Sequence, residues 1–264
     1  MLSLLQNKYH IVRHGDFATN GNTKLLYGGF SIILCLDDYI SRNSSDCFII
    51  FIGSSVIWSL TELFLQISKT RVIKPMYITT PWDTKHKLSR PFGIILQGIQ
   101  EGGLVTTLGL YFGDRLFEPK TFLFVHAFIL FIIRNIYIRK NTHKASKRQV
   151  NTPICLILMG SVTVYNIHTL YHNPEHIQRQ LSMFLVMTYI CSFWTYFAWY
   201  RGFRTIEVHI KNPLYITTNG EPNTQLTEYY TKPVSIIDTF CILAYDVFFE
   251  IGVAYMLFYN MFIC

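Results

Sequence analysis

Four acidic residues fall inside long apolar stretches of this sequence: Glu62, Glu101, Asp246 and Glu250. An ionised carboxylate costs a few kcal/mol or more inside a bilayer unless it is paired, hydrated or protonated. Gln97 precedes Glu101 by four residues, as Asp246 precedes Glu250, so each pair projects from one face of a helix. This pattern is typical of a site that binds a cation or exchanges a proton during a conformational change.

The same carboxylates have a structural interpretation. Protonated carboxyl and amide groups can hydrogen-bond between helices, and small residues allow the helices to approach closely. The glycines beside them suit this role: Gly98, Gly102, Gly103 and Gly252. The residue pattern leaves both interpretations open.

Histidines form a second group of candidate ligands. His168 and His172 are four residues apart, a spacing that can place two imidazoles on one metal ion, and His126 is expected at a similar depth in another helix. With Asp37 and Asp38 nearby, a metal centre at the outer membrane edge is one hypothesis. The other is that these histidines are solvated or interfacial, because Pro174 interrupts the spacing from His172 to His176 and the set lies at the membrane edge. No motif identifies a cofactor.

The composition indicates a membrane protein. The 264 residues are 50% hydrophobic and only 15% charged, with a mean hydropathy of +0.27, which excludes a disordered chain and an ordinary acidic soluble domain. The apolar residues collect into runs long enough to cross a bilayer, and lipid-facing backbone must be helical unless it closes into a barrel. We therefore predict an all-α integral membrane protein with seven transmembrane helices, at residues 24–40, 48–67, 91–113, 121–138, 152–171, 181–200 and 236–263.

The basic residues predict the orientation. Given these seven helices, all but four of the 23 lysine and arginine residues fall on one side of the membrane; the exceptions are Arg42, Arg115, Lys120 and Arg179. Because cytoplasmic loops are enriched in lysine and arginine, we expect a cytoplasmic N-terminus and a C-terminus on the outer side. Residues 1–20 lack a continuous apolar core, so no cleaved signal is expected.

Two similar loops suggest an internal repeat. Residues 73–80 have the sequence IKPMYITT and residues 210–218 have IKNPLYITT, and in the helices that follow, Glu101 aligns with Glu250. The two YITT segments are β-prone and are expected to pair as an antiparallel ribbon. A duplicated three-helix unit joined by one helix would give a parallel 3+1+3 repeat.

This count is similar to the plan of the sugar-exporting SWEET proteins. No PQ-loop motif occurs, and the charge rule gives the opposite orientation, so membership is not inferred. The predicted division is an N-terminal cytoplasmic segment, a first three-helix repeat, a connector helix with a basic loop, and a second repeat, at residues 1–23, 24–113, 114–150 and 151–264.

The leading functional hypothesis is a transporter or channel for a small solute or cation. Its path would be lined by the mid-membrane residues Glu101, Glu250, Asp246, Gln97 and Glu62. The alternatives are a membrane-embedded lipid-modifying enzyme and a non-catalytic scaffold or assembly protein. The expected partners are the lipid bilayer and anionic lipid at the basic cytoplasmic loops, and nucleic acid is not expected. The glycine-rich face at residues 98–103 also suits a homo-oligomer interface.

Overall fold

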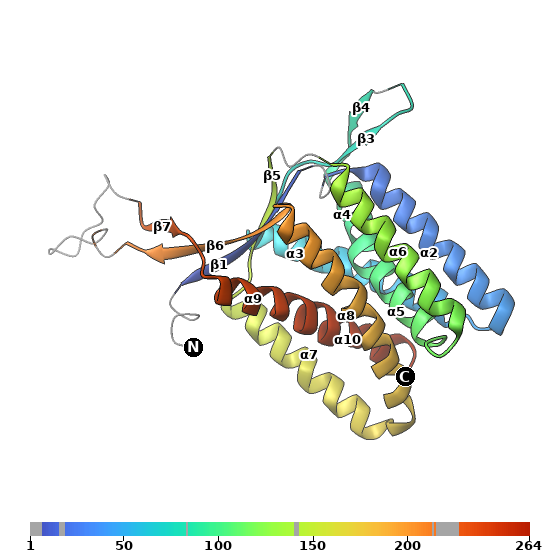
Figure 1. The fold of residues 1–264 in the computed structure, drawn as a ribbon. Helices are drawn as coiled ribbons and strands as arrows, with labels where there is room; N and C mark the ends of the chain where they lie inside the picture. The colour runs from blue at the N-terminus through green and yellow to red at the C-terminus, as the bar shows by residue number, and fades with distance from the viewer. Residues whose placement is uncertain (1–6, 16–18, 83, 140–142, 213, 215–226) are drawn as a thin grey trace.

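A computed structural model describes residues 7–15, 19–82, 84–139, 143–212, 214 and 227–264. In these residues seven helices form a bundle, and a five-stranded sheet lies at one end of it (Figure 1). The mostly helical architecture with seven helices confirms part of the prediction. The all-α class is wrong, because the segments between the helices pair into a sheet.

Five helices are uninterrupted: α2 (Gly21–Arg42), α3 (Asp46–Ile67), α6 (Pro119–Tyr137), α7 (Pro153–His172) and α8 (Ile177–Tyr200), the last preceded by the short helix η2 (Pro174–His176). Local signals set several ends. The side chains of Asn20 and Thr152 accept hydrogen bonds from backbone N–H groups in the first turns of α2 and α7. Asn43 ends α2 in the left-handed conformation that terminates many helices.

The other two helices each contain a π-helical segment. One runs through α4 (Arg90–Gly98), η1 (Ile99–Leu104) and α5 (Val105–Gly113), and the other through α9 (Ile236–Tyr245), η3 (Asp246–Val253) and α10 (Ala254–Phe262). π-Helical segments are rare in proteins overall, but those that occur are often at functional sites. Glu101 lies in η1, and Asp246 and Glu250 lie in η3, so the candidate acids occupy the two irregular segments.

Five helices are long and apolar enough to span a membrane: α3, α6, α7, α8 with η2, and the helix from α9 to α10. The surface of α7 shows why a lipid environment suits the chain. Ile157, Val164 and Ile167 on this helix are each more than 60% exposed. Such an apolar surface is unfavourable in water.

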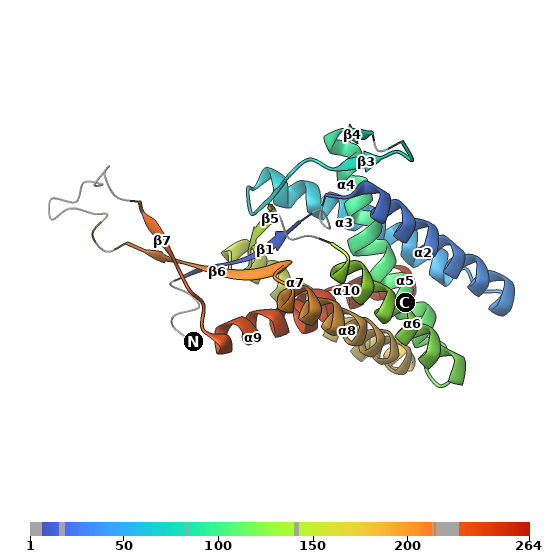
Figure 2. The same cartoon turned by 45° about the horizontal axis from the view of Figure 1, so that its top comes forward.

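The sheet has the strand order β2-β5-β1-β6-β7, and all neighbours are antiparallel. Its strands are β1 (Lys8–His14), β2 (Arg71–Ile73), β5 (Lys144–Gln149), β6 (Arg204–Lys211) and β7 (Tyr229–Lys232). They all lie at one end of the bundle, which we call the sheet end, whereas the turns from α2 to α3, α5 to α6 and α7 to α8 lie at the far end (Figure 2).

The strand register brings four arginines together. Arg71 of β2 is opposite Arg148 of β5, and Arg13 of β1 is opposite Arg204 of β6. At the centre, Arg13 is opposite Ser146. Residues directly opposite each other share a face of the sheet, and so do Ser146 and Arg148, which are two residues apart on β5. All four arginines therefore project from the face that meets the helices.

The YITT segment of residues 77–80 also forms a strand, but with a local partner. β3 (Tyr77–Thr79) pairs with β4 (Lys85–Lys87) in a separate two-stranded sheet. The other segment of the predicted ribbon, residues 215–218, lies outside the described residues.

Candidate functional site

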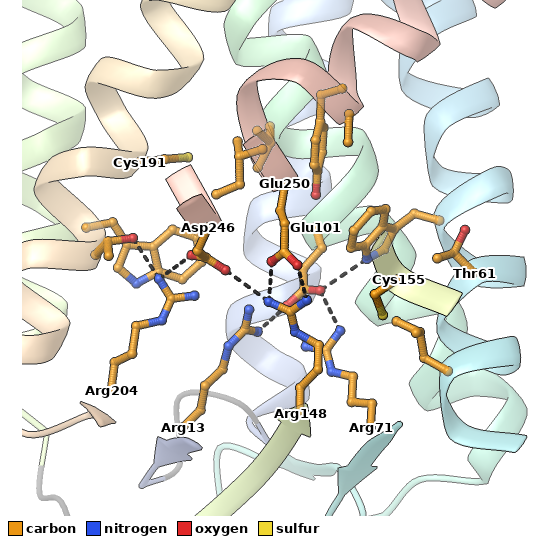
Figure 3. Close-up of a pocket in the computed structure, with 18 of the residues that line it drawn as sticks. Arg13, Thr61, Arg71, Glu101, Arg148, Cys155, Cys191, Arg204, Asp246 and Glu250 are labelled. Carbon is orange, nitrogen blue, oxygen red and sulfur yellow. Dashed lines mark hydrogen bonds and ion pairs between the residues drawn. The ribbon is translucent and has the colours of Figure 1, made fainter. Parts of the chain in front are cut away.

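A cavity of about 300 Å³ lies between the helices and the sheet, and its two ends differ in chemistry. Apolar side chains of α3, α7, α8 and α10 form most of its wall. At the sheet end, Glu101, Asp246 and Glu250 meet arginines that project from four strands, and we call this the arginine end (Figure 3). Its arginines are Arg13, Arg71, Arg148 and Arg204.

Glu101 is the centre of the first group of ion pairs. Arg71 donates two hydrogen bonds of 2.9 Å to its two carboxylate oxygens, and Arg13 forms a second ion pair with it. The indole Nε1 of Trp58 donates a third contact, at 3.1 Å. Arg71 also pairs with Glu62 of α3 at 2.6 Å, so Glu62 joins the group through Arg71.

Close packing of α3 on η1 positions Glu101. A β-carbon on Gly102 would overlap the Ser54 carbonyl oxygen, and one on Gly98 would overlap Ser59. Only glycine allows the two backbones to come this close. The predicted use of these glycines for close helix approach therefore agrees with the structure.

The second group contains Asp246 and Glu250. Arg148 donates a hydrogen bond of 2.8 Å to Glu250 Oε1 and one of 3.1 Å to Asp246. Asp246 also pairs with Arg204 at 2.8 Å, and Arg204 donates to the Thr195 hydroxyl at 2.7 Å. Each group thus holds two arginines and two carboxylates.

The carboxylates keep these arginines charged in a buried site. Burial alone would lower the pKa of Arg71, but Glu101 and Glu62 together raise it above its usual value. Glu250 and Asp246 likewise outweigh burial and raise the pKa of Arg148. Burial is the larger influence on Arg204, whose pKa is lowered despite the attraction of Asp246. The site therefore carries fixed guanidinium groups beside an apolar cavity.

The predicted path residues do not all meet. Glu101, Asp246 and Glu250 line the cavity, and Glu62 contacts it through Arg71. Gln97 does not line it. This side chain is buried, and neither of its polar atoms has a hydrogen-bond partner in the described chain.

The predicted histidine set is not gathered into one site. His168 packs against His172 with ring centroids 4.5 Å apart, whereas His126 hydrogen-bonds to Tyr189. Among the described residues, no group of three or more His, Cys, Asp or Glu side chains is placed to hold a metal ion. The metal site stays a prediction.

The two predicted outer acids belong to an ion-pair cluster at the far end. Asp38 pairs with Arg115 at 2.8 Å, and Asp37 accepts a hydrogen bond from Tyr111. Beside them, Arg179 donates two bonds of 2.7 Å to Asp114. These contacts tie α2, α5 and α8 together at the end opposite the arginines.

Sequence reasoning missed the four arginines of the site. Their charge was assigned to membrane orientation, because they lie between apolar runs. A usable signal was present: Glu62 precedes Arg71 by nine residues, as Thr195 precedes Arg204, and each pair is in contact. The register that gathers the arginines depends on long-range strand pairing, which local sequence does not specify.

Comparisons with protein-family models, with curated proteins and with solved structures find no match to this chain. The functional argument therefore rests on the geometry of the cavity and its charges.

Proposed function

We propose that the chain is a multi-pass membrane protein that moves a small solute through the cavity between its two three-helix units. The observation that carries this proposal is the cavity of about 300 Å³ with apolar walls and an arginine end. Ligand pockets typically start at about this volume and combine apolar walls with a few well-placed polar groups.

Ion pairing decides between kinds of solute. Each of the three lining carboxylates already contacts one or more guanidinium groups. A bare cation would have to displace an arginine, which makes a cation pathway the weaker version of the hypothesis. The solute we propose therefore has a group that arginine can bind.

Seven membrane crossings and a cytoplasmic sheet end belong to the same proposal. The sheet end carries the basic segments between the helices, so the positive-inside rule favours it as the cytoplasmic side. The side chains of Arg13 and Arg148 keep 23% and 15% exposure there. Water and small solutes would reach the cavity first from this side.

The 3+1+3 repeat is also part of the proposal. The strand register supports it. Arg71 of β2 lies opposite Arg148 of β5, just as Arg204 of β6 lies opposite Arg13 of β1, so a two-fold rotation between β5 and β1 would exchange the two pairs. Two related halves around one cavity are a common plan for transporters.

Thiol labelling tests the proposal. Cys155 and Cys191 line the cavity, whereas Cys47 is fully buried in the helical core. Variants that retain one of these cysteines, reconstituted in oriented vesicles, would be exposed to a charged, membrane-impermeant methanethiosulfonate reagent from either side. Cys155 and Cys191 are buried in the structure, so we expect them to react only when the cavity opens, faster from the sheet side than from the far side, as alternating access requires.

The Cys47 variant is the matched control and should not react until the protein is denatured. Labelling of Cys191 from the sheet side only would contradict transport and leave a binding protein. Failure of both Cys155 and Cys191 to react from either side would contradict the solute-accessible cavity itself.

A further inference from the structure

The cavity is flanked by two helix pairs that occupy equivalent places. α3 leads into β2, which carries Arg71, and α8 leads into β6, which carries Arg204. Arg71 and Arg204 occupy corresponding positions in the register of the sheet. By the same correspondence α2 matches α7. The gap between α2 and α8 is therefore equivalent to the gap between α3 and α7, and we call them the first and second seams.

The first seam is filled by α6. Side chains of this helix pack with Tyr27 of α2 and Ile190 of α8 in one apolar cluster, and Phe30 of α2 stacks on Phe128 at 5.3 Å between ring centroids. The space left there is a cavity of only about 20 Å³. The α6 residues of the cluster are Val125, Phe128, Ile129, Ile132 and Ile136.

The second seam has no equivalent of α6 in the described chain. α10 packs on both α3 and α7 on the inner side, but α3 and α7 form no packed interface with each other. Both line the central cavity, α3 with Ile57 and Thr61 and α7 with Met159 and Val162.

Leu158 connects the cavity to the outside of the bundle. It lines the cavity and is also 47% exposed on the apolar surface of α7. The wall of the cavity is thus continuous with the surface that would face lipid. An opening beside Leu158 would give a molecule dissolved in the bilayer a path into the cavity that avoids water.

The side chains at the arginine end indicate which kind of ligand group could bind there. The four arginines of this end balance the charge of Glu62, Glu101, Asp246 and Glu250. In the described chain Arg13 donates through one guanidinium nitrogen, to Glu101, and its side chain keeps 23% exposure. In addition, the Nε of Arg71 is buried and has no hydrogen-bond partner in the described chain. Guanidinium groups bind carboxylate and phosphate with paired hydrogen bonds, so the remaining donors of Arg13 and Arg71 favour an anionic group.

We propose that the solute is a single-chain lipid with an anionic headgroup, which enters the cavity sideways through the second seam. This inference rests on the proposed function and names its substrate class. The headgroup lies at the arginine end, at the level of the sheet, and the chain lies along Leu158, Val162 and the α3 wall. The volume, at the lower limit of ligand pockets, suits one acyl chain better than two.

Tryptophan fluorescence tests the headgroup and the chain. Of the four tryptophans, Trp58 and Trp194 line the cavity, so a W82F/W199F variant reports on it alone. In a neutral detergent we expect saturable quenching by 12-bromododecanoate. The cationic 12-bromododecyltrimethylammonium should bind about tenfold more weakly, because its headgroup meets arginine.

Competitors separate the sources of the anion. Dodecyl phosphate should displace 12-bromododecanoate, since it has a chain and an anionic headgroup, and inorganic phosphate should not. Displacement by inorganic phosphate alone would overturn the lipid assignment and indicate a water-borne anion. Equal quenching by the two brominated chains would overturn the headgroup assignment.

Variants at the seam test the route of entry. L158F/V162F narrows the second seam, and we expect stopped-flow quenching to slow by about fivefold or more while the protein still folds. I157F/V164F adds the same rings to outward positions of α7, each 68% exposed, and should leave the rate unchanged. Equal rates in both variants would overturn lateral entry.

The two proposals fail separately. If Cys191 is labelled from both sides but no brominated chain quenches the tryptophans, the lipid assignment is wrong and solute transport stands. If neither labelling nor quenching occurs, both are wrong.

Discussion

The two groups of ion pairs hold equal charge but place their acids differently. In the first, Arg71 contacts Glu62 of α3 and Glu101 of η1. In the second, the position nine residues before Arg204 is Thr195, and the second acid is Asp246 on η3. In the alignment of the two repeats, Gln97 occupies the position of Asp246, so the first group has an amide where the second group has an acid. The four arginines keep corresponding places in the register while the acids vary, which indicates that the strands define the site.

This difference predicts unequal costs for removing an arginine. In R71M, Glu62 loses its arginine partner and Glu101 keeps only Arg13, so about 3–5 kcal/mol of stability should be lost. In R204M, Asp246 keeps Arg148, so the loss should be about 1–3 kcal/mol. Unfolding in mixed detergent with increasing SDS would measure both variants.

The double variant R71M/E62Q is the control, and it should recover part of the R71M loss by removing one unpaired charge. Equal destabilisation by R71M and R204M would contradict the distinction between the two groups.

Neutralising one acid of each group together tests their role at the cavity. In E101Q/E250Q the arginines lose two competing anions, so the affinity for 12-bromododecanoate should rise about tenfold, or about 1.4 kcal/mol. Solute movement should change as well, because the ion pairs can no longer re-form. Quenching and transport that match the parent protein would show that these carboxylates are structural only.

Glu62 and Thr195 give a smaller contrast. E62Q leaves Arg71 with both oxygens of Glu101 and should cost about 1–3 kcal/mol. T195V removes one neutral hydrogen bond to Arg204 and should cost about 1 kcal/mol. If T195V is the more harmful in the same SDS titration, the second group depends on α8 more than the ion pairs indicate.

The prediction with the smallest effect at neutral pH concerns a single histidine in β1. Burial, with help from Lys147, lowers the pKa of His10 from 6.5 to about 4. The unfolded chain therefore binds a proton that the fold excludes, and the contribution of neutral His10 to stability is lost as the pH falls from about 6.5 towards 4. H10A should flatten the dependence of thermal unfolding on pH in this range. An unchanged pH profile in H10A would contradict this assignment.

The helices were predictable and the sheet was not, for a physical reason. Apolar runs of bilayer length are a local signal, and the seven helices begin and end within a few residues of them. β5, by contrast, has the sequence KASKRQ, with no apolar residue larger than alanine, and becomes a strand because β1 and β2 pair with its edges.

The acids of the candidate site could be predicted from the sequence, but its arginines could not. Glu101, Asp246 and Glu250 were identified because a charge inside an apolar run is costly and therefore conspicuous. Their partners were hidden, since Arg13, Arg71, Arg148 and Arg204 lie in short polar segments far apart in the chain. Gln97 was misplaced relative to the cavity for a related reason: the π-helical segment that begins at Ile99 changes the facing of the residues after it.

The most direct test of the central claim is a cryo-electron microscopy map of the protein in lipid nanodiscs. We expect a cavity open between α3 and α7, with an elongated density that starts beside Arg13 and Arg148 and runs along Leu158. A map in which α3 and α7 touch and side chains fill the space above the arginines would contradict it, and would leave the ion pairs as a structural link between the sheet and the helices.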